Sequence, residues 1–213
     1  MRIIGRFIGS FLIVVLLGAA VPVLAGTSFS FLFNRDSVTN DNQLFLNLAV
    51  THSGYERATL EPVLPRISYL QADLPVVLFL AQESGRPVDF IVGLRSQGLA
   101  WSVIFTQLRV PVDSLFAGID QDPGPPYGKA WGYWKKHSRE IRLSDSEVSG
   151  LVKIQLGSRW TEASPFELAS ARGRGGKSVV TLVADKQGRH YGGKSEGARG
   201  GRKGKGGGHG GHE

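Results

Sequence analysis

The sequence of 213 residues contains no cysteine and only one methionine. Disulfide bonds, thiolate nucleophiles, cysteine-ligated zinc and a lipid anchor on cysteine are therefore excluded. The His-Glu-x-x-His and Gly-x-Ser-x-Gly signatures are also missing, and spacing identifies no catalytic partner for His52 or His137. We expect a protein that is not an enzyme, with no catalytic residue and no cofactor. The alternative is a hydrolase whose site residues lie far apart in the sequence.

What the chain does have is an N-terminal export pattern. Two arginines precede an apolar run at 11–20, and Pro22 and a small-residue end at Ala25 follow it. The run is about half of the roughly 20 apolar residues that a spanning helix needs. We interpret 1–25 as a cleaved signal peptide, with an uncleaved anchor as the alternative. We therefore expect an exported protein, periplasmic or extracellular, whose mature chain starts near Gly26 and has no transmembrane span.

Positive charge is concentrated at the C-terminal end. Residues 26–171 carry a net charge of −2, whereas residues 172–213 carry +7. Within that end, residues 186–213 are rich in glycine and poor in apolar side chains, which predicts a disordered tail. Its charge would attract polyanions such as nucleic acid or acidic glycans. His209 and His212 could bind a transition metal weakly; alternatively, the tail only increases solubility.

Two segments near the mature N-terminus show the alternation typical of half-buried strands. Apolar residues there take every second position: Phe29, Phe31, Phe33, Leu44, Leu46, Leu48 and Val50. Turn-forming residues at 34–37 and 40–42 separate the segments. We predict a β-hairpin within 26–67, packed on the helices that follow.

Helical spacing of apolar residues begins further along the chain. In 68–122 it predicts three short helices. The first has its N-cap at Asp73, the second starts at Pro87 and stops at Gly98, and the third carries Trp101. These helices form the first predicted helical unit.

A second helical unit is predicted at 143–185. Ser144 and Glu147 have the spacing of a capping box, in which each residue satisfies a backbone N–H of the other. Ser164 starts another helix, with Pro165 at its first position.

The two helical units repeat one pattern at an offset of 77 residues. The matched pairs are Leu74 with Leu151, Ile91 with Leu168, Arg95 with Arg172, and Gly98 with Gly175. A unit used twice leaves one apolar stripe on each copy, so the copies should pack together. The predicted fold is therefore α+β and mainly helical: an N-terminal β-hairpin on two repeated trihelical, helix-turn-helix-like units, followed by the disordered tail.

Residues 123–142 form an aromatic and basic connector between the units. Rings interleaved with cations can stack on bases or sugars and hold phosphate or carboxylate. The rings can equally form a hydrophobic latch between the units, with the lysine stems along the surface. The candidate binding residues are Tyr127, Lys129, Trp131, Tyr133, Trp134, Lys135 and Lys136.

Two familiar motifs do not carry their usual function here. Residues 171–178 satisfy a permissive phosphate-loop pattern, but the residues before them are helical instead of forming a buried strand. Residues 91–116 resemble the helix-turn-helix of resolvase-type DNA-binding proteins. The helix that would enter the major groove, near 112–119, has no Lys or Arg, and DNA phosphates repel an acidic helix. We expect no sequence-specific DNA binding.

The export signal, the Leu-Arg-x-x-Gly-Leu-x-Trp segment at 94–101, the connector and the glycine-rich tail together resemble a family of small exported bacterial proteins without assigned function. The similarity covers about residues 70–185. It implies location and modular organisation and brings no ligand. We expect an interaction or structural module of the envelope or extracellular space with an unidentified partner. The alternative is a polyanion binder that uses the basic tail.

Overall fold

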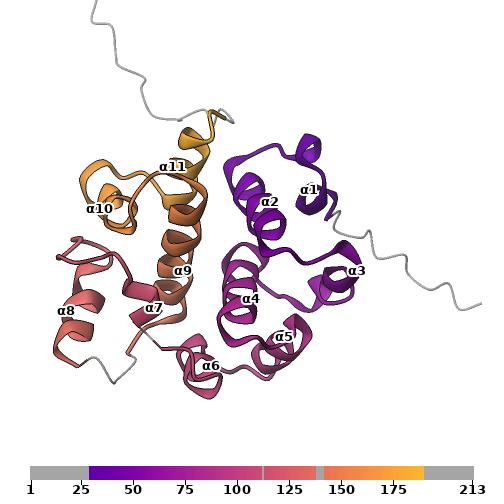
Figure 1. Cartoon of the computed structure of the whole chain (residues 1–213), viewed down its shortest axis with the longest axis horizontal. Coiled ribbons are helices and arrows are strands. Elements are labelled where there is room, and N and C mark those ends of the chain that lie inside the picture. The colour runs from indigo at the N-terminus through magenta and orange to yellow at the C-terminus, as the bar shows by residue number, and fades with distance from the viewer. Residues whose placement is uncertain (1–28, 112, 138–141, 190–213) are drawn as a thin grey trace, which may run out of the picture.

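The computed structural model describes residues 29–111, 113–137 and 142–189. Within these ranges the chain forms eleven α-helices, two short 3₁₀ helices and no strand (Figure 1). None of the helices described is long and apolar enough to cross a membrane. The predicted signal peptide and the tail beyond residue 189 lie outside the described residues.

The α-helices follow one another in a single chain of short elements. In order they are α1 (Ser30–Phe33), α2 (Asp41–Ser53), α3 (Arg57–Leu60), α4 (Leu70–Ser84), α5 (Val88–Ser96), α6 (Trp101–Gln107), α7 (Asp113–Phe116), α8 (Gly128–Lys136), α9 (Asp145–Trp160), α10 (Pro165–Gly175) and α11 (Val179–Lys186). The 3₁₀ helices are Arg35–Ser37 and Leu64–Arg66.

The predicted N-terminal β-hairpin is wrong, because its two segments lie on α1 and α2. Every residue of α2 from Leu44 to Val50 is buried. A helix buried on all sides has no polar face and therefore no clear 3.6-residue period, so alternate apolar residues imitate a strand. Asn40, which we expected in the turn, is the N-cap of α2: its side chain accepts a hydrogen bond from the backbone N–H of Gln43 at 3.0 Å.

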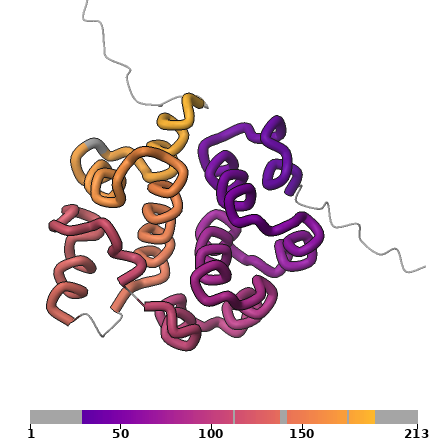
Figure 2. The backbone as a smooth tube through the Cα atoms, viewed as in Figure 1, coloured from indigo at the N-terminus to yellow at the C-terminus, as the bar shows by residue number. Residues whose placement is uncertain are grey.

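The neighbours of α2 explain why its whole surface is covered. It packs against α1, α4 and α11, which lie around it in Figures 1 and 2. The side-chain amide of Asn47 donates to the backbone oxygen of Phe31 at 2.9 Å, and the ring of Trp160 lies 5.0 Å from that of Phe45. The N-terminal segment is thus part of the same core as both helical units.

In the first helical unit, two of the three predicted helix starts are confirmed. Helix α5 begins directly after Pro87, and α6 begins at Trp101. The first helix differs: α4 starts at Leu70, with Tyr69 as its N-cap. Asp73 is therefore a buried residue of the first turn, with a role described below, and it is not a cap.

In the second helical unit, the predicted helix starts are confirmed. Ser144 and Glu147 form a reciprocal capping box at the start of α9. At the start of α10, the Ser164 hydroxyl accepts from the backbone N–H of Glu167, and Pro165 holds the first helical position. The segment that matched a phosphate-loop pattern lies at the C-terminal end of α10, and no strand precedes it in the part of the chain described.

Helices α4 and α9 lie side by side at the centre of the molecule. Near their first turns, the Ser149 hydroxyl donates to the backbone oxygen of Ala72 at 2.8 Å, and these residues are 77 positions apart. Near their last turns, Arg159 forms an ion pair with Glu83 at 2.7 Å. The two helices therefore run in the same direction, in almost the register of the sequence offset. That the two units derive from one repeated unit stays a prediction.

Candidate functional site

The connector packs closely onto the second helical unit. A Cβ atom at Gly150 of α9 would lie 2.5 Å from the Tyr127 hydroxyl, and one at Gly173 of α10 would lie 2.9 Å from the backbone oxygen of Pro125. Tyr127 itself is buried. Glycine at these two positions is what admits the connector between α9 and α10.

The two tryptophans of α8 point inward. The indole N–H of Trp131 donates to the backbone oxygen of Ile119 at 2.8 Å, and that of Trp134 donates to the Asp113 carboxylate at 2.7 Å. The Trp134 ring also stacks on Phe116, with centroids 4.8 Å apart. This is the geometry that we expected of a latch, since the rings bind the protein itself.

The lysines of α8 are exposed and face solvent. Lys129, Lys135 and Lys136 make up what we call the cationic face of α8. The Lys135 ammonium lies 4.7 Å from the Trp134 ring centroid and 5.6 Å from that of Trp131. Within the described ranges, these lysines form no ion pair with a carboxylate. Tyr133 carries a further cation, since the Arg142 guanidinium lies 5.2 Å from its ring.

A pocket of about 430 Å³ opens between the connector and the second helical unit. Two cationic side chains line it, and we call it the Lys153–Arg172 pocket. Its other lining residues are Asn42, Ala72, Pro126, Tyr127, Ser146, Glu147, Ser149, Gly150, Ser178, Val179 and Val180.

The titratable groups of this pocket are perturbed. Burial lowers the pKa of Lys153, and the positive charge of Arg172 lowers it further, while Asp73 acts in the opposite direction. Burial raises the pKa of Tyr127, and the charge and hydrogen bond of Arg172 oppose that rise. The pocket thus places two positive charges close together, one of them partly withdrawn from water.

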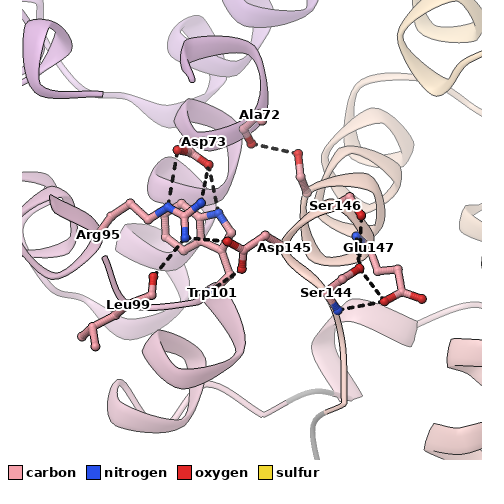
Figure 3. Close-up of polar contacts among 10 residues, drawn as sticks. Ala72, Asp73, Arg95, Leu99, Trp101, Ser144, Asp145, Ser146 and Glu147 are labelled. Carbon is pink, nitrogen blue, oxygen red and sulfur yellow. Dashed lines mark hydrogen bonds and ion pairs between the residues drawn. The ribbon is translucent and has the colours of Figure 1, made fainter. Parts of the chain in front are cut away.

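A buried polar cluster occupies the first unit (Figure 3). The Arg95 guanidinium lies 3.4 Å from the Asp73 carboxylate, 2.6 Å from that of Asp145 and 4.7 Å from the ring centroid of Trp101. Trp101 donates its indole N–H to Asp73 at 3.0 Å and its backbone N–H to Asp145 at 2.8 Å. The cluster joins α4, α5, α6 and the start of α9, and its donors and acceptors satisfy one another.

The histidines are not brought into a catalytic arrangement. His52 stacks on Trp160 at 5.5 Å, beside a pocket of about 170 Å³ whose lining contains no carboxylate. His137 follows α8 and its ring lies 4.7 Å from that of Tyr133. Across the described ranges, no group of three or more His, Cys, Asp or Glu side chains is placed to hold a metal ion. The candidate metal ligands His209 and His212 lie outside the described residues.

Sequence reasoning missed the Lys153–Arg172 pocket. Lys153 was not singled out, and Arg172 appeared only as the repeat partner of Arg95. A signal was present: at the same offset, Gly150 stands opposite Asp73, so the second copy lacks the carboxylate of the first. Reading the repeat for what had been lost, as well as for what matched, would have marked this position.

Comparison with models of protein families, with curated proteins and with solved structures found no match. The resemblance to a family of small exported bacterial proteins therefore stays a prediction. The functional argument depends on the geometry alone.

Proposed function

We propose that the chain is an exported, non-enzymatic interaction module of the bacterial envelope or extracellular space, which binds a polyanion through the cationic face of α8. The basic tail adds long-range attraction. The observation that supports this function is the opposite orientation of rings and lysines on α8: the tryptophans are fixed inward and the lysines are exposed.

The inward rings make α8 a rigid support for its charges. A helix as short as Gly128–Lys136 is unstable alone in water. Trp131 and Trp134 hold it against the body by hydrogen bonds and stacking. Exposed lysines on a fixed support lose less conformational freedom when they bind phosphate, sulfate or carboxylate groups. Their positions in the last turn also suit the helix dipole, which leaves the charges available to a partner.

A salt titration tests this function. Residues 26–213 are titrated with labelled duplex DNA and with an acidic polysaccharide at several salt concentrations, and the variant carries Lys129→Gln, Lys135→Gln and Lys136→Gln. Each lost contact with a phosphate lowers the salt dependence of log K by about 0.9 for duplex DNA, so we expect a slope smaller by about 2–3. A chain that ends at Arg189 measures the contribution of the tail.

The matched control removes the same charge elsewhere. Arg57, Lys177 and Lys186 are exposed and lie in surface ion pairs away from α8. Their triple replacement by Gln should leave more of the binding intact than the α8 variant does. Equal losses would mean that only net charge matters. No salt-sensitive binding to either polyanion by the intact chain would overturn the proposed function.

A further inference from the structure

The two helical units can be compared position by position. Residues 77 apart occupy corresponding places, as the contact between Ser149 and Ala72 shows. In the first unit, Arg95 is held by the carboxylate of Asp73 and by the ring of Trp101. The corresponding residues of the second unit are Arg172, Gly150 and Ser178. The arginine is present in both units, whereas the carboxylate and the indole are present in only one.

The missing side chains leave space in the second unit. Gly150, Arg172 and Ser178 all line the Lys153–Arg172 pocket. The Tyr127 hydroxyl takes the position next to Gly150, where a side chain would begin. A neutral hydroxyl can pair with the guanidinium of Arg172 but cannot neutralise it. The pocket therefore exists where the first unit has its own internal anion.

The charge of this pocket is not compensated within the chain. Over the described ranges, neither Lys153 nor Arg172 forms an ion pair with a carboxylate. Two carboxylates lie near, but both are engaged: Glu147 accepts from the backbone N–H and the hydroxyl of Ser144, at 2.8 and 2.7 Å, and Asp73 is bound by Arg95. An added anion would meet two cations and no carboxylate that is free of other partners.

We propose that the Lys153–Arg172 pocket binds an oxyanion, the carboxylate or phosphate group of a small ligand, in the place that corresponds to the Asp73 carboxylate of the first unit. A guanidinium binds either group in a bidentate manner, and a lysine adds a compact positive charge. The volume of about 430 Å³ lies within the usual range of roughly 300–1,000 Å³ for small-molecule sites. Val179 and Val180, in the first turn of α11, add backbone N–H groups without partners in that helix.

This inference goes beyond the proposed function, because it concerns a different surface and a different class of ligand. The cationic face of α8 can fail to bind a polyanion while the pocket binds an oxyanion, and the reverse can also hold. The two experiments therefore give separable results.

Calorimetric and NMR titrations test the pocket. Residues 26–213 are titrated with inorganic phosphate and, separately, with succinate, at an ionic strength held constant with sodium chloride. We expect saturable binding of at least one of these anions, with amide shifts at Gly150 and Ser178. Affinity should fall at least tenfold in Arg172→Gln and in Lys153→Gln. The phosphate and succinate titrations show which of the two oxyanions the pocket prefers.

Two control variants keep the test specific. Arg174→Gln removes an exposed charge from the same helix, and Lys135→Gln removes one from α8. Neither should change the affinity. Binding by neither anion would overturn the proposal. So would an unchanged affinity in both pocket variants with native circular dichroism, or an equal loss in Arg174→Gln.

Discussion

The Tyr127 hydroxyl lies where a side chain at position 150 would begin: a Cβ atom at Gly150 would be 2.5 Å from that oxygen. Two more atoms of the Tyr127 ring would be 3.0 and 3.1 Å from the same Cβ. Real Cβ atoms do not approach so closely, so the ring and the missing side chain depend on each other. The connector is thus fitted to the second unit at the position where that unit lacks a carboxylate.

Replacing Gly150 by alanine should destabilise the fold. The added methyl group collides with the buried Tyr127 ring, and overpacking of this kind costs about 1–3 kcal/mol. Alanine regains up to about 1 kcal/mol through its higher helix propensity. We expect a net loss of about 1–2 kcal/mol in the free energy of unfolding, measured by urea titration.

A matched glycine and a double variant complete this test. Gly132 of α8 has no heavy atom within 4 Å of its Cβ position, so Gly132→Ala should be neutral or stabilising. Tyr127→Phe removes the closest atom of the collision, so Gly150→Ala should cost less in that background. Strictly additive losses would contradict the proposed fit between the ring and Gly150.

Removing the Asp73 carboxylate should be the most damaging change in the first unit. Asp73→Ala leaves Arg95 without one of its two carboxylates and the indole N–H of Trp101 without its acceptor. Breaking a buried ion pair on one side costs about 3–5 kcal/mol. Asp73→Asn keeps an acceptor and should cost less. Urea unfolding measures both variants.

The control for Asp73 is an exposed ion pair. Asp89 pairs with Arg66 at the surface, where such pairs contribute about 0–1 kcal/mol. Asp89→Ala should therefore change stability little. A similar loss in Asp73→Ala and Asp89→Ala would show that the cluster in Figure 3 does not stabilise the fold.

The helical start of α2 can be tested through its cap. Asn40→Ala removes the acceptor for the backbone N–H of Gln43 and should cost about 1 kcal/mol, whereas Asn40→Gly should cost only a few tenths. Urea unfolding gives both values, and backbone chemical shifts should report helix over Asp41–Ser53. Strand-like shifts, or equal stability of the two variants and the native chain, would contradict the cap.

The success of sequence reasoning depended on how local each signal was. Capping at Ser144 and Ser164 is decided within four residues, and both caps are present. Asn40 has the same chemistry, but the continuous apolar run after it hid the helical period, because α2 is buried on every side. That burial depends on α4 and α11, which lie far away in the sequence. Asp73 shows the same limit: the cap-like residue is used by Arg95, 22 positions later.

The candidate site divides in the same way. Composition alone marked the connector, and the structure places its rings inward and its lysines outward. The Lys153–Arg172 pocket is formed by four separate segments, whose side chains have no common local pattern. Only a comparison of the two units at the offset of 77 residues shows it, through the absence of side chains at Gly150 and Ser178.

Replacing Lys153 by methionine should raise stability at neutral pH. Burial lowers the pKa of Lys153 in the folded chain, whereas the unfolded chain keeps the ordinary value of 10.5. Below the folded pKa both states are protonated, and the folded state carries the full cost of a buried charge. Between the two values the folded state has already lost its proton, so the stability of the native chain rises with pH. Methionine has a similar volume and no charge, so it removes the cost.

The measurement is the free energy of unfolding of both chains from pH 7 to pH 10.5. We expect Lys153→Met to be more stable at pH 7 and the difference to shrink as the pH rises, because the native lysine becomes neutral. Tyr127 is common to both chains, so the effect of its raised pKa largely cancels in the difference. A less stable variant with a parallel pH curve would mean that a partner within the chain stabilises the charge. A more stable variant that also loses oxyanion binding would show that the charge is kept for its ligand at a cost in stability.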